Sequence, residues 1–95
     1  MYVTFVGHVI EWRGPAPFYF VRVPEDECAG IQEVASAATY GWGVIPVSAR
    51  IGEIDFSTSL FPKDGGYLLP IKNAVRKPQN LSAGDEVTVE MTVRL

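Results

Sequence analysis

The sequence predicts a mainly β protein with two short helices, in which six strands close into a small barrel. Stretches rich in β-branched and aromatic residues alternate with turns, which seven prolines and nine glycines mark. The two halves of the chain repeat one order of elements, namely strand, strand, helix and strand. Because 95 residues suffice for one modest core, we expect residues 1–95 to form a single domain.

A long strand is predicted over residues 2–12, followed by a turn over 13–17 and a return strand over 18–23. Both faces of the long strand are mostly apolar. This pattern indicates burial on two sides, or a bend, which we expect at Gly7. The two faces carry Val3, Phe5 and Val9, and Val6, Ile10 and Trp12.

The first helix is predicted over about residues 25–38. Pro24 suits the first turn of a helix, and the acidic run 25–27 complements the positive end of the helix dipole. An apolar stripe follows at helical spacing; it consists of Cys28, Ile31, Val34, Ala35 and Ala38. The next strand, residues 44–51, contains Pro46, which places that part at an edge or a bulge.

The second half begins with a strand over residues 53–61. A turn over 62–66 leads to a short return strand over 67–69. Pro70 is expected to start a second helix, which must end before Pro78 because proline cannot continue it.

The second helix and the last strand should each bury one face. We expect the helix to bury Ile71, Ala74 and Val75. After a turn over 83–85, a strand over 86–95 alternates clearly between apolar and polar residues. Its inward side chains are expected to be Val87, Val89, Met91 and Val93.

The shared order defines two pseudo-repeats, about 2–51 and 52–95. In each, a return strand ends in an aliphatic-proline pair, Val23-Pro24 or Leu69-Pro70. The repeat is one of pattern rather than of residue identity. Two β-β-α-β units around a pseudo-twofold axis would close six strands into a barrel whose ends the helices cap, so that few sheet edges remain exposed.

Part of the second repeat resembles a known signature. Residues 69–76, Leu81, Gly84-Asp85 and 87–89 resemble the core of the AbrB and MazE-like swapped-hairpin barrels, which are bacterial transition-state regulators and antitoxins. Those proteins assemble a barrel from two chains. Two units in one chain would remove that need.

Over nearly its whole length, the chain more closely resembles an uncharacterised bacterial family of double-split β-barrels, classed as a domain of unknown function. Some members are fused to domains of the YdeI/OmpD-associated type. The resemblance implies a six-stranded double-split barrel and transfers no activity. The segments that carry it are residues 41–47, 51–52, 59–62, 66–70, 75–77 and 84–85.

Charge and composition limit the partners and the location. A formal net charge of −3 and a pI near 5.0 disfavour attraction to DNA or to an anionic membrane, although a local basic patch is compatible with them. The single cysteine, Cys28, fits a reducing compartment. Since no signal-peptide pattern or membrane-length apolar run occurs, we expect a cytoplasmic protein.

The sequence offers little for catalysis. His8, the one histidine, could be a general base or an ordinary strand residue; Cys28 could be a nucleophile near a helix N-terminus or a small core residue. Ser57 or Ser59 could attack a substrate, but the pattern supplies no base beside them. No metal-ligand spacing or phosphate-binding glycine loop occurs. We therefore expect no enzyme, no metal and no cofactor.

Two groups of residues are candidates for binding. Lys72, Arg76 and Lys77 would make the second helix basic, with Arg50 and Lys63 near it; this is an anion or partner site, or a solvated helix face. The second group could line a ligand groove or fill the core, and it comprises Ser57, Thr58, Ser59, Trp42, Phe61 and Tyr67. The candidate ligand residues are Lys72, Arg76, Lys77, Arg50, Tyr67 and Trp42.

The preferred function is a non-enzymatic module that binds an unknown small ligand or a protein partner. The alternative is a DNA-binding regulator or antitoxin-like protein of the swapped-hairpin type, which the basic second helix favours. The acidic total and the small number of arginines count against DNA.

Overall fold

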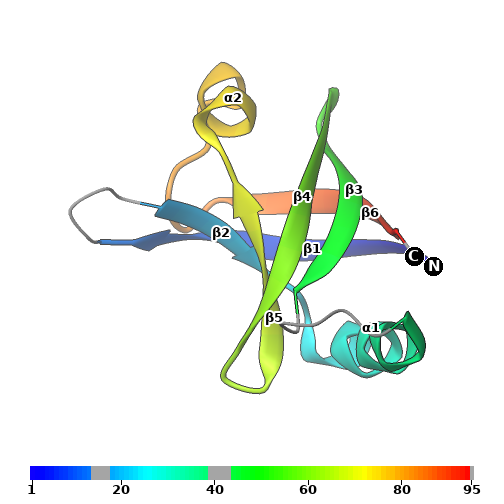
Figure 1. The fold of residues 1–95 in the computed structure, drawn as a ribbon. Coiled ribbons are helices and arrows are strands. Elements are labelled where there is room, and N and C mark those ends of the chain that lie inside the picture. Colours follow the sequence, from blue (N-terminus) through cyan, green and yellow to red (C-terminus); the bar gives the residue numbers. More distant parts are fainter. Residues whose placement is uncertain (14–17, 39–43, 95) are drawn as a thin grey trace.

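The computed structural model describes residues 1–13, 18–38 and 44–94. Within them, six antiparallel strands form a closed barrel in the order β1-β2-β5-β4-β3-β6 (Figure 1). The elements are β1 (Tyr2–Trp12), β2 (Phe18–Arg22), α1 (Glu25–Ala38), β3 (Ile45–Ile51), β4 (Ile54–Lys63), β5 (Gly66–Ile71), α2 (Asn73–Arg76), the short 3-10 turn η1 (Lys77–Gln79) and β6 (Glu86–Val93). The predicted class, a mainly β barrel with two short helices, is confirmed.

Alternation along the strands fills the barrel. In β6 every second side chain is buried and the intervening ones are exposed, as predicted. The same alternation holds from Tyr2 to Ile10 of β1, so the burial on two sides that the sequence suggested is wrong, and Val6, Ile10 and Trp12 are exposed. The largest fully buried side chains come from five strands, from the connection between β2 and α1, and from α1 itself: Ile31, Ile45, Leu60, Leu69, Met91, Val21, Val23, Val47 and Val89. This interior accounts for the stability of the fold.

Strand β1 changes partners along its length, close to Gly7. Residues from Tyr2 to His8 pair with β6, and those from Val9 to Trp12 pair with β2. A Cβ atom on Gly7 would lie 2.7 Å from Val21 Cγ1, so a glycine is required where the two strands pack together. Gly7 therefore lies next to the point where the strand passes from one neighbour to the other.

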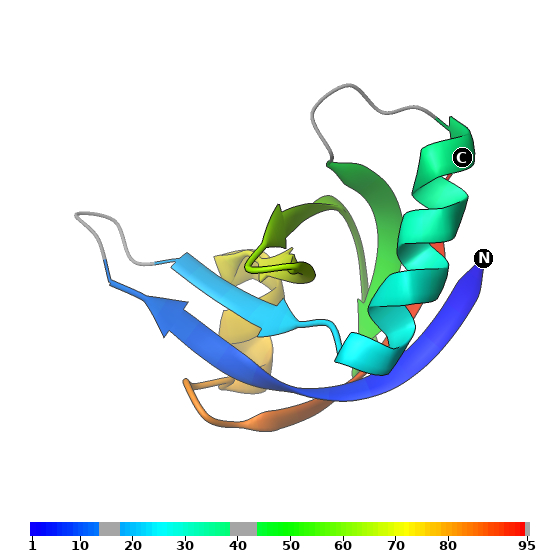
Figure 2. The ribbon, with the colours of Figure 1, turned by 90° about the horizontal axis from the view of Figure 1, so that it is seen from below.

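The two helices lie at opposite ends of the barrel (Figures 1 and 2). Helix α1 has the predicted bounds and contributes Cys28 and Ile31 to the core. Helix α2 contributes Val75. In the described part of the chain, neither helix is long and apolar enough to cross a membrane.

Three expectations about the second half were wrong. Pro70 does not start a helix: β5 continues through Pro70, which pairs with Phe20 of β2. Proline is tolerated there because β5 pairs with β4 only up to Leu68, which leaves one side of the strand without a ladder. Since α2 starts three residues later than expected, Ala74 is exposed rather than buried.

The turn after β4 is also shorter than predicted. Pro62 and Lys63 belong to the strand and pair with β5, so only Asp64 and Gly65 connect the two. Both have positive φ, 51° and 78°. This is the geometry of a two-residue type I′ hairpin, which suits the twist of the strands.

Candidate functional site

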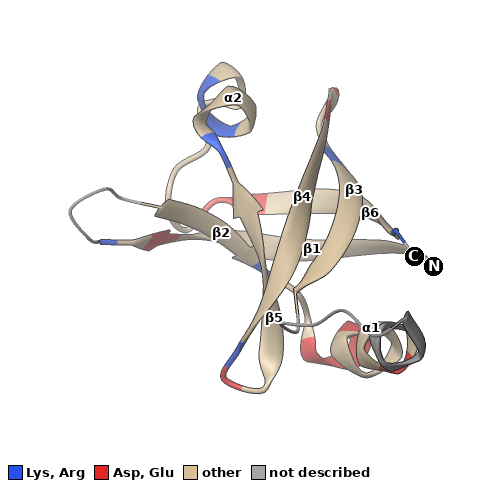
Figure 3. Ribbon diagram, viewed as in Figure 1, with Lys and Arg blue, Asp and Glu red and all other residues tan. Residues whose placement is uncertain are grey.

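The barrel has an acidic end and a basic end, as the charges of the two predicted helices suggested. The acidic first turn of α1 lies at one end of the barrel, and Lys72, Arg76 and Lys77 surround α2 at the other (Figure 3). The turn between β3 and β4 lies beside η1, because the Gln79 side chain occupies the space next to Gly52. Arg50 lies in β3, two residues before Gly52. The structure thus brings Arg50 to the α2 end of the barrel.

Arg76 is engaged in the fold. Its Nη1 donates a hydrogen bond to the carbonyl oxygen of Leu81 and its Nη2 to Asn73 Oδ1, each at 3.2 Å. The guanidinium also lies 3.9 Å from the centre of the Tyr19 ring, a cation–π contact. The guanidinium that would be the strongest anion ligand of the basic end is therefore already committed.

Tyr19 extends this network to β1. Its hydroxyl donates a 2.8 Å hydrogen bond to Glu11 Oε2. That bond is the main cause that lowers the pKa of Glu11 from 4.5, with burial opposing it and Arg13 assisting. The same bond, followed by burial, raises the pKa of Tyr19 from 10.0. A chain of contacts thus runs from α2 to the β1–β2 hairpin.

The remaining candidates lie apart. The Arg50 guanidinium contacts Asp55 at 3.5 Å and donates to the carbonyl oxygen of Gly52 at 3.2 Å. Tyr67 lies near the other end, next to α1, where burial, followed by the electrostatic effect of Cys28, raises its pKa from 10.0. Trp42 lies outside the described residues. The basic group and Tyr67 therefore do not form one site.

The candidate catalytic residues are also separate. His8 is exposed on β1, with its Nε2 3.9 Å from the Glu86 carboxylate. Cys28 is buried and its Sγ lies 3.7 Å from the carbonyl oxygen of Val23. Ser57 and Ser59 are on β4, three strands from β1 around the barrel. Among residues 1–13, 18–38 and 44–94, no three His, Cys, Asp or Glu side chains are grouped to hold a metal.

A surface that the sequence did not single out is more prominent. The outer side of β1, β2, β4 and β5 carries a cluster of apolar side chains, which we call the aromatic face; it consists of Ile10, Trp12, Phe18, Phe20, Phe61 and Leu68. The strand register explains the cluster, because Ile10 and Phe20, Trp12 and Phe18, and Phe61 and Leu68 are cross-strand partners.

The aromatic face contains a small hydrophobic centre of its own. The Phe20 ring is 5.2 Å from that of Phe61 and 6.2 Å from that of Trp12, both in edge-on arrangements. Phe20 and Leu68 are buried, yet they do not belong to the core cluster inside the barrel. Their burial comes from neighbouring side chains on the outer surface.

The rest of the face is open to solvent. Trp12 is 48%, Phe18 61% and Ile10 39% exposed. Hollows of about 470 Å³ and 340 Å³ adjoin Phe20, the first on the side of Trp12 and the second toward Lys72. The sequence carried one signal for the aromatic face, namely the second apolar face of residues 2–12. It did not show the strand register, which brings β2, β4 and β5 alongside β1.

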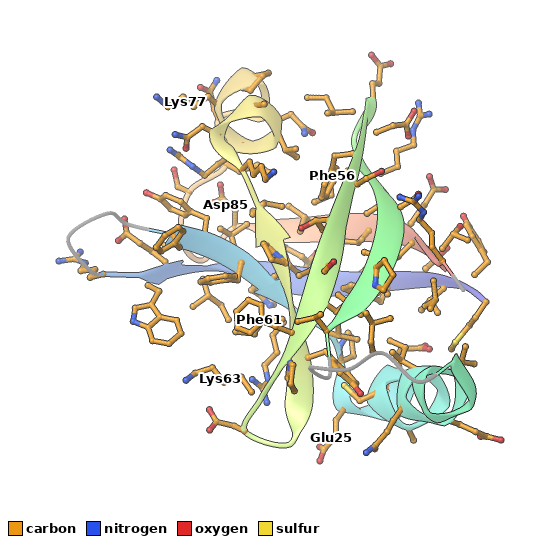
Figure 4. All side chains as sticks on the ribbon, in the orientation of Figure 1. Glu25, Phe56, Phe61, Lys63, Lys77 and Asp85 are labelled. Carbon is orange, nitrogen blue, oxygen red and sulfur yellow. The ribbon has the colours of Figure 1, made fainter. Side chains whose placement is uncertain are left out.

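Cations surround the aromatic face. Arg13, Arg22 and Lys63 line the larger hollow together with Glu11 and Asp64. The Lys63 ammonium extends from the end of β4 and lies 4.4 Å from the centre of the Trp12 ring (Figure 4). Within the described residues, no carboxylate lies within 4.0 Å of the cationic groups of Arg22 or Lys63.

The fold and surface together define a small closed antiparallel β-barrel with an outward-facing aromatic patch. The chain belongs to the DUF1905 family, a domain of unknown function whose family model matches residues 5–91. This match confirms the resemblance to an uncharacterised domain family. Among curated proteins, none matches the chain.

Proposed function

We propose that this domain is a non-enzymatic binding module and that its aromatic face binds an acidic segment of a partner protein. The observation that carries the proposal is the exposure of Ile10, Trp12 and Phe18 around the buried Phe20 on the outside of a closed barrel. A contiguous apolar patch of this kind marks an interaction surface on a soluble domain.

Side chains, rather than the backbone, supply this surface. At the aromatic face β1 pairs with β2, β2 with β5, and β5 with β4 through Phe61 and Leu68, so this face offers side chains rather than a free sheet edge. Tryptophan and other aromatic side chains carry a large share of the energy at protein interfaces. Trp12 and Phe18, cross-strand partners at the end of the β1–β2 hairpin, are the expected anchors.

Charge indicates the chemistry of the partner. Although the whole chain is acidic, Arg22 and Lys63 lie beside the apolar side chains without a carboxylate within 4.0 Å among the described residues. Lys72 lines the second hollow on the far side of Phe20. A segment that combines large apolar side chains with Asp or Glu complements both features.

A protein segment fits better than a small molecule. Sites for small apolar ligands usually enclose most of the ligand surface. Here Trp12 and Phe18 remain about half exposed or more, at 48% and 61%, and the hollows lie open on either side of Phe20. An extended partner can cover both hollows at once.

The absence of catalysis remains part of the proposal. His8 and the serines of β4 are on strands separated by two others in either direction around the barrel, which supports a binding role over acyl transfer. Incubation with a panel of ester and phosphoester substrates should give no turnover. Turnover lost in Ser57→Ala would refute this part.

We also propose a cytoplasmic location. The free thiol of Cys28, buried against the Val23 carbonyl oxygen, suits a reducing compartment. Cell fractionation of a tagged chain tests this, and recovery outside the cytoplasm would contradict it.

The finer architecture is proposed as a double-split barrel of two β-β-α-β units. The strand order supports it, since exchanging β1 with β4, β2 with β5 and β3 with β6 leaves every neighbour relation unchanged. Neither unit buries its apolar face alone. Residues 1–51 and 52–95, expressed separately, should therefore not fold; a cooperatively folded half would argue against the proposal.

DNA binding is not supported. Of the five arginines in the sequence, Arg13 pairs with Glu11, Arg50 with Asp55, and Arg76 contacts Tyr19. These contacts reduce the number of guanidinium groups available for a nucleic acid backbone.

The decisive experiment is selection of peptides from a random displayed library. We expect enriched sequences that contain aromatic or large aliphatic residues next to Asp or Glu, and Trp12→Ala should weaken their binding roughly 30-fold, as for an interface hot spot. Tyr2→Ala is the control, because Tyr2 is also an exposed aromatic residue (63%, against 48% for Trp12) and lies outside the face. Peptides that bind both variants equally, or that lack acidic residues, would refute the proposal.

A further inference from the structure

A second concave surface lies on the other side of the barrel. It is a groove of about 400 Å³ on the outer surface of β4, β3 and β6 and the start of β1, and it shares no lining residue with the aromatic face. Its lining is mixed: Phe56 and Ala49 supply apolar surface, and the other residues carry hydroxyl or charged groups. The lining residues include the candidate Arg50 and the serine Ser57, which the sequence had placed near a possible ligand groove.

The floor of the groove is a row of hydroxyl groups. Ser57 pairs with Ser48, Ser48 with Thr92, and Thr92 with Tyr2, so four hydroxyl-bearing residues lie side by side on four adjacent strands. Neighbouring strands are about 4.8 Å apart. This spacing is comparable with the distance between hydroxyls on opposite sides of a pyranose ring. Each hydroxyl can both donate and accept.

The next row of residues forms a charged wall. Arg50 is the cross-strand partner of both Asp55 and Glu90. Arg50 contacts the Asp55 carboxylate at 3.5 Å, whereas no Lys, Arg or His of the described residues lies within 4.0 Å of the Glu90 carboxylate. The wall thus provides carboxylate acceptors, of which Glu90 keeps its hydrogen-bonding capacity, and the Nη2 group of Arg50, since Nε and Nη1 already contact Gly52 and Asp55.

At the end of the hydroxyl row, the groove reaches an aromatic side chain. Tyr2 is 63% exposed and lines the groove with its ring available to a ligand. An aromatic ring offers an apolar face for the C–H groups of a sugar, while its hydroxyl remains a hydrogen-bonding group. Hydroxyls, planar charged groups and an aromatic ring are together the groups that a polyhydroxylated molecule requires.

We propose that this groove binds a neutral saccharide. The hydroxyl row and Arg50 hydrogen-bond to the sugar hydroxyls, Glu90 accepts from them, and the Tyr2 ring covers one end. Two carboxylates against one guanidinium leave the lining with a net negative charge, which disfavours phosphorylated or acidic sugars. The proposal is independent of the aromatic face.

The test is a titration of the whole domain with sugars, in which NMR records the chemical shifts of the backbone amides. The probes are glucose, galactose, maltose and cellobiose at up to about 50 mM, where even a millimolar Kd gives near saturation. We expect concentration-dependent shifts at Ser48, Ser57 and Thr92 with at least one of them, and smaller shifts with its phosphorylated form. Equal shifts with the phosphorylated sugar, or no shifts with any probe, would overturn the proposal.

A matched pair of variants on β6 tests the site itself. Thr92→Val removes one hydroxyl from the groove, and Thr88→Val makes the same exchange at an exposed position of the same strand outside it. Loss of one hydrogen bond should weaken binding about fivefold in Thr92→Val, with no change in Thr88→Val. Equal affinity in the two variants would refute the assignment. Both positions are exposed, so folding should be retained.

Discussion

The contacts of Arg76 predict that this residue stabilises the fold rather than binding an anion. Arg76→Ala removes the part-buried hydrogen bond to Leu81, about 1.5 kcal/mol for a charged donor. It also removes the contact with the Tyr19 ring, about 1 kcal/mol, and the exposed bond to Asn73, which adds a few tenths.

One contribution to the change in the free energy of unfolding has the opposite sign. The Arg76 Nε atom is buried without a hydrogen-bond partner among the described residues, and removing it relieves a cost of about 1 kcal/mol. The net loss in the free energy of unfolding is therefore about 2 kcal/mol. For a domain of this size, that corresponds to a fall in Tm of roughly 10 °C.

Urea denaturation followed by tryptophan fluorescence measures this loss. Arg76→Lys should lose about half as much, because it keeps a cation over Tyr19 but not the two hydrogen bonds of the guanidinium. Lys77→Ala is the control, since Lys77 is exposed and close in sequence. If Arg76→Ala and Lys77→Ala have the same midpoint, the structural role assigned to Arg76 is wrong.

Three further predictions concern the core, a turn and pH. Leu60→Ala should lower the free energy of unfolding by about 2–5 kcal/mol, measured by urea denaturation, because Leu60 is fully buried; a loss below 1 kcal/mol would contradict this packing. Gly52→Ala should destabilise by more than about 1 kcal/mol, since its φ is +62° and Gln79 fills the adjacent space; an unchanged Tm would exclude that geometry. The lowered pKa of Glu11 means that its contribution is present above the unfolded-state pKa and lost as pH falls through the folded-state pKa. Glu11→Gln should therefore flatten the acid side of the stability–pH curve and, by ultraviolet titration, bring the pKa of Tyr19 back toward 10.0; an unchanged tyrosine titration would refute the hydrogen bond.

Local patterns predicted most of the fold. The strict alternation from Val87 to Val93 fixed which face of the last strand is buried, and the stripe containing Cys28 and Ile31 gave the bounds of α1. The mistake at Pro70 has a physical origin. The same aliphatic-proline pair precedes a helix in the first half, but the second pair remains in a strand because β2 offers a ladder to it.

The candidate sites were harder to predict, because they depend on contacts between distant parts of the chain. A basic residue at position 76 suggests an anion ligand until Tyr19, 57 positions away, is found beneath it. Likewise, Phe20 and Leu68 each look like core residues, as their burial suggests. Only the register of four strands shows that they lie outside the barrel and form the centre of an exposed face.

The apolar side chains are divided between the barrel interior and its outer surface, and this division indicates where a binding site can lie. The inward-facing side chains already fill the barrel, so its interior is occupied by the core that holds it together. Trp12 and Phe18 contribute little to that core, and an exposed apolar patch on a chain of 95 residues increases the risk of aggregation. The partner proposed above would cover the patch and account for both facts. The groove on the other side shares no lining residue with the two hollows of the aromatic face, so the two proposed ligands would not compete for the same residues.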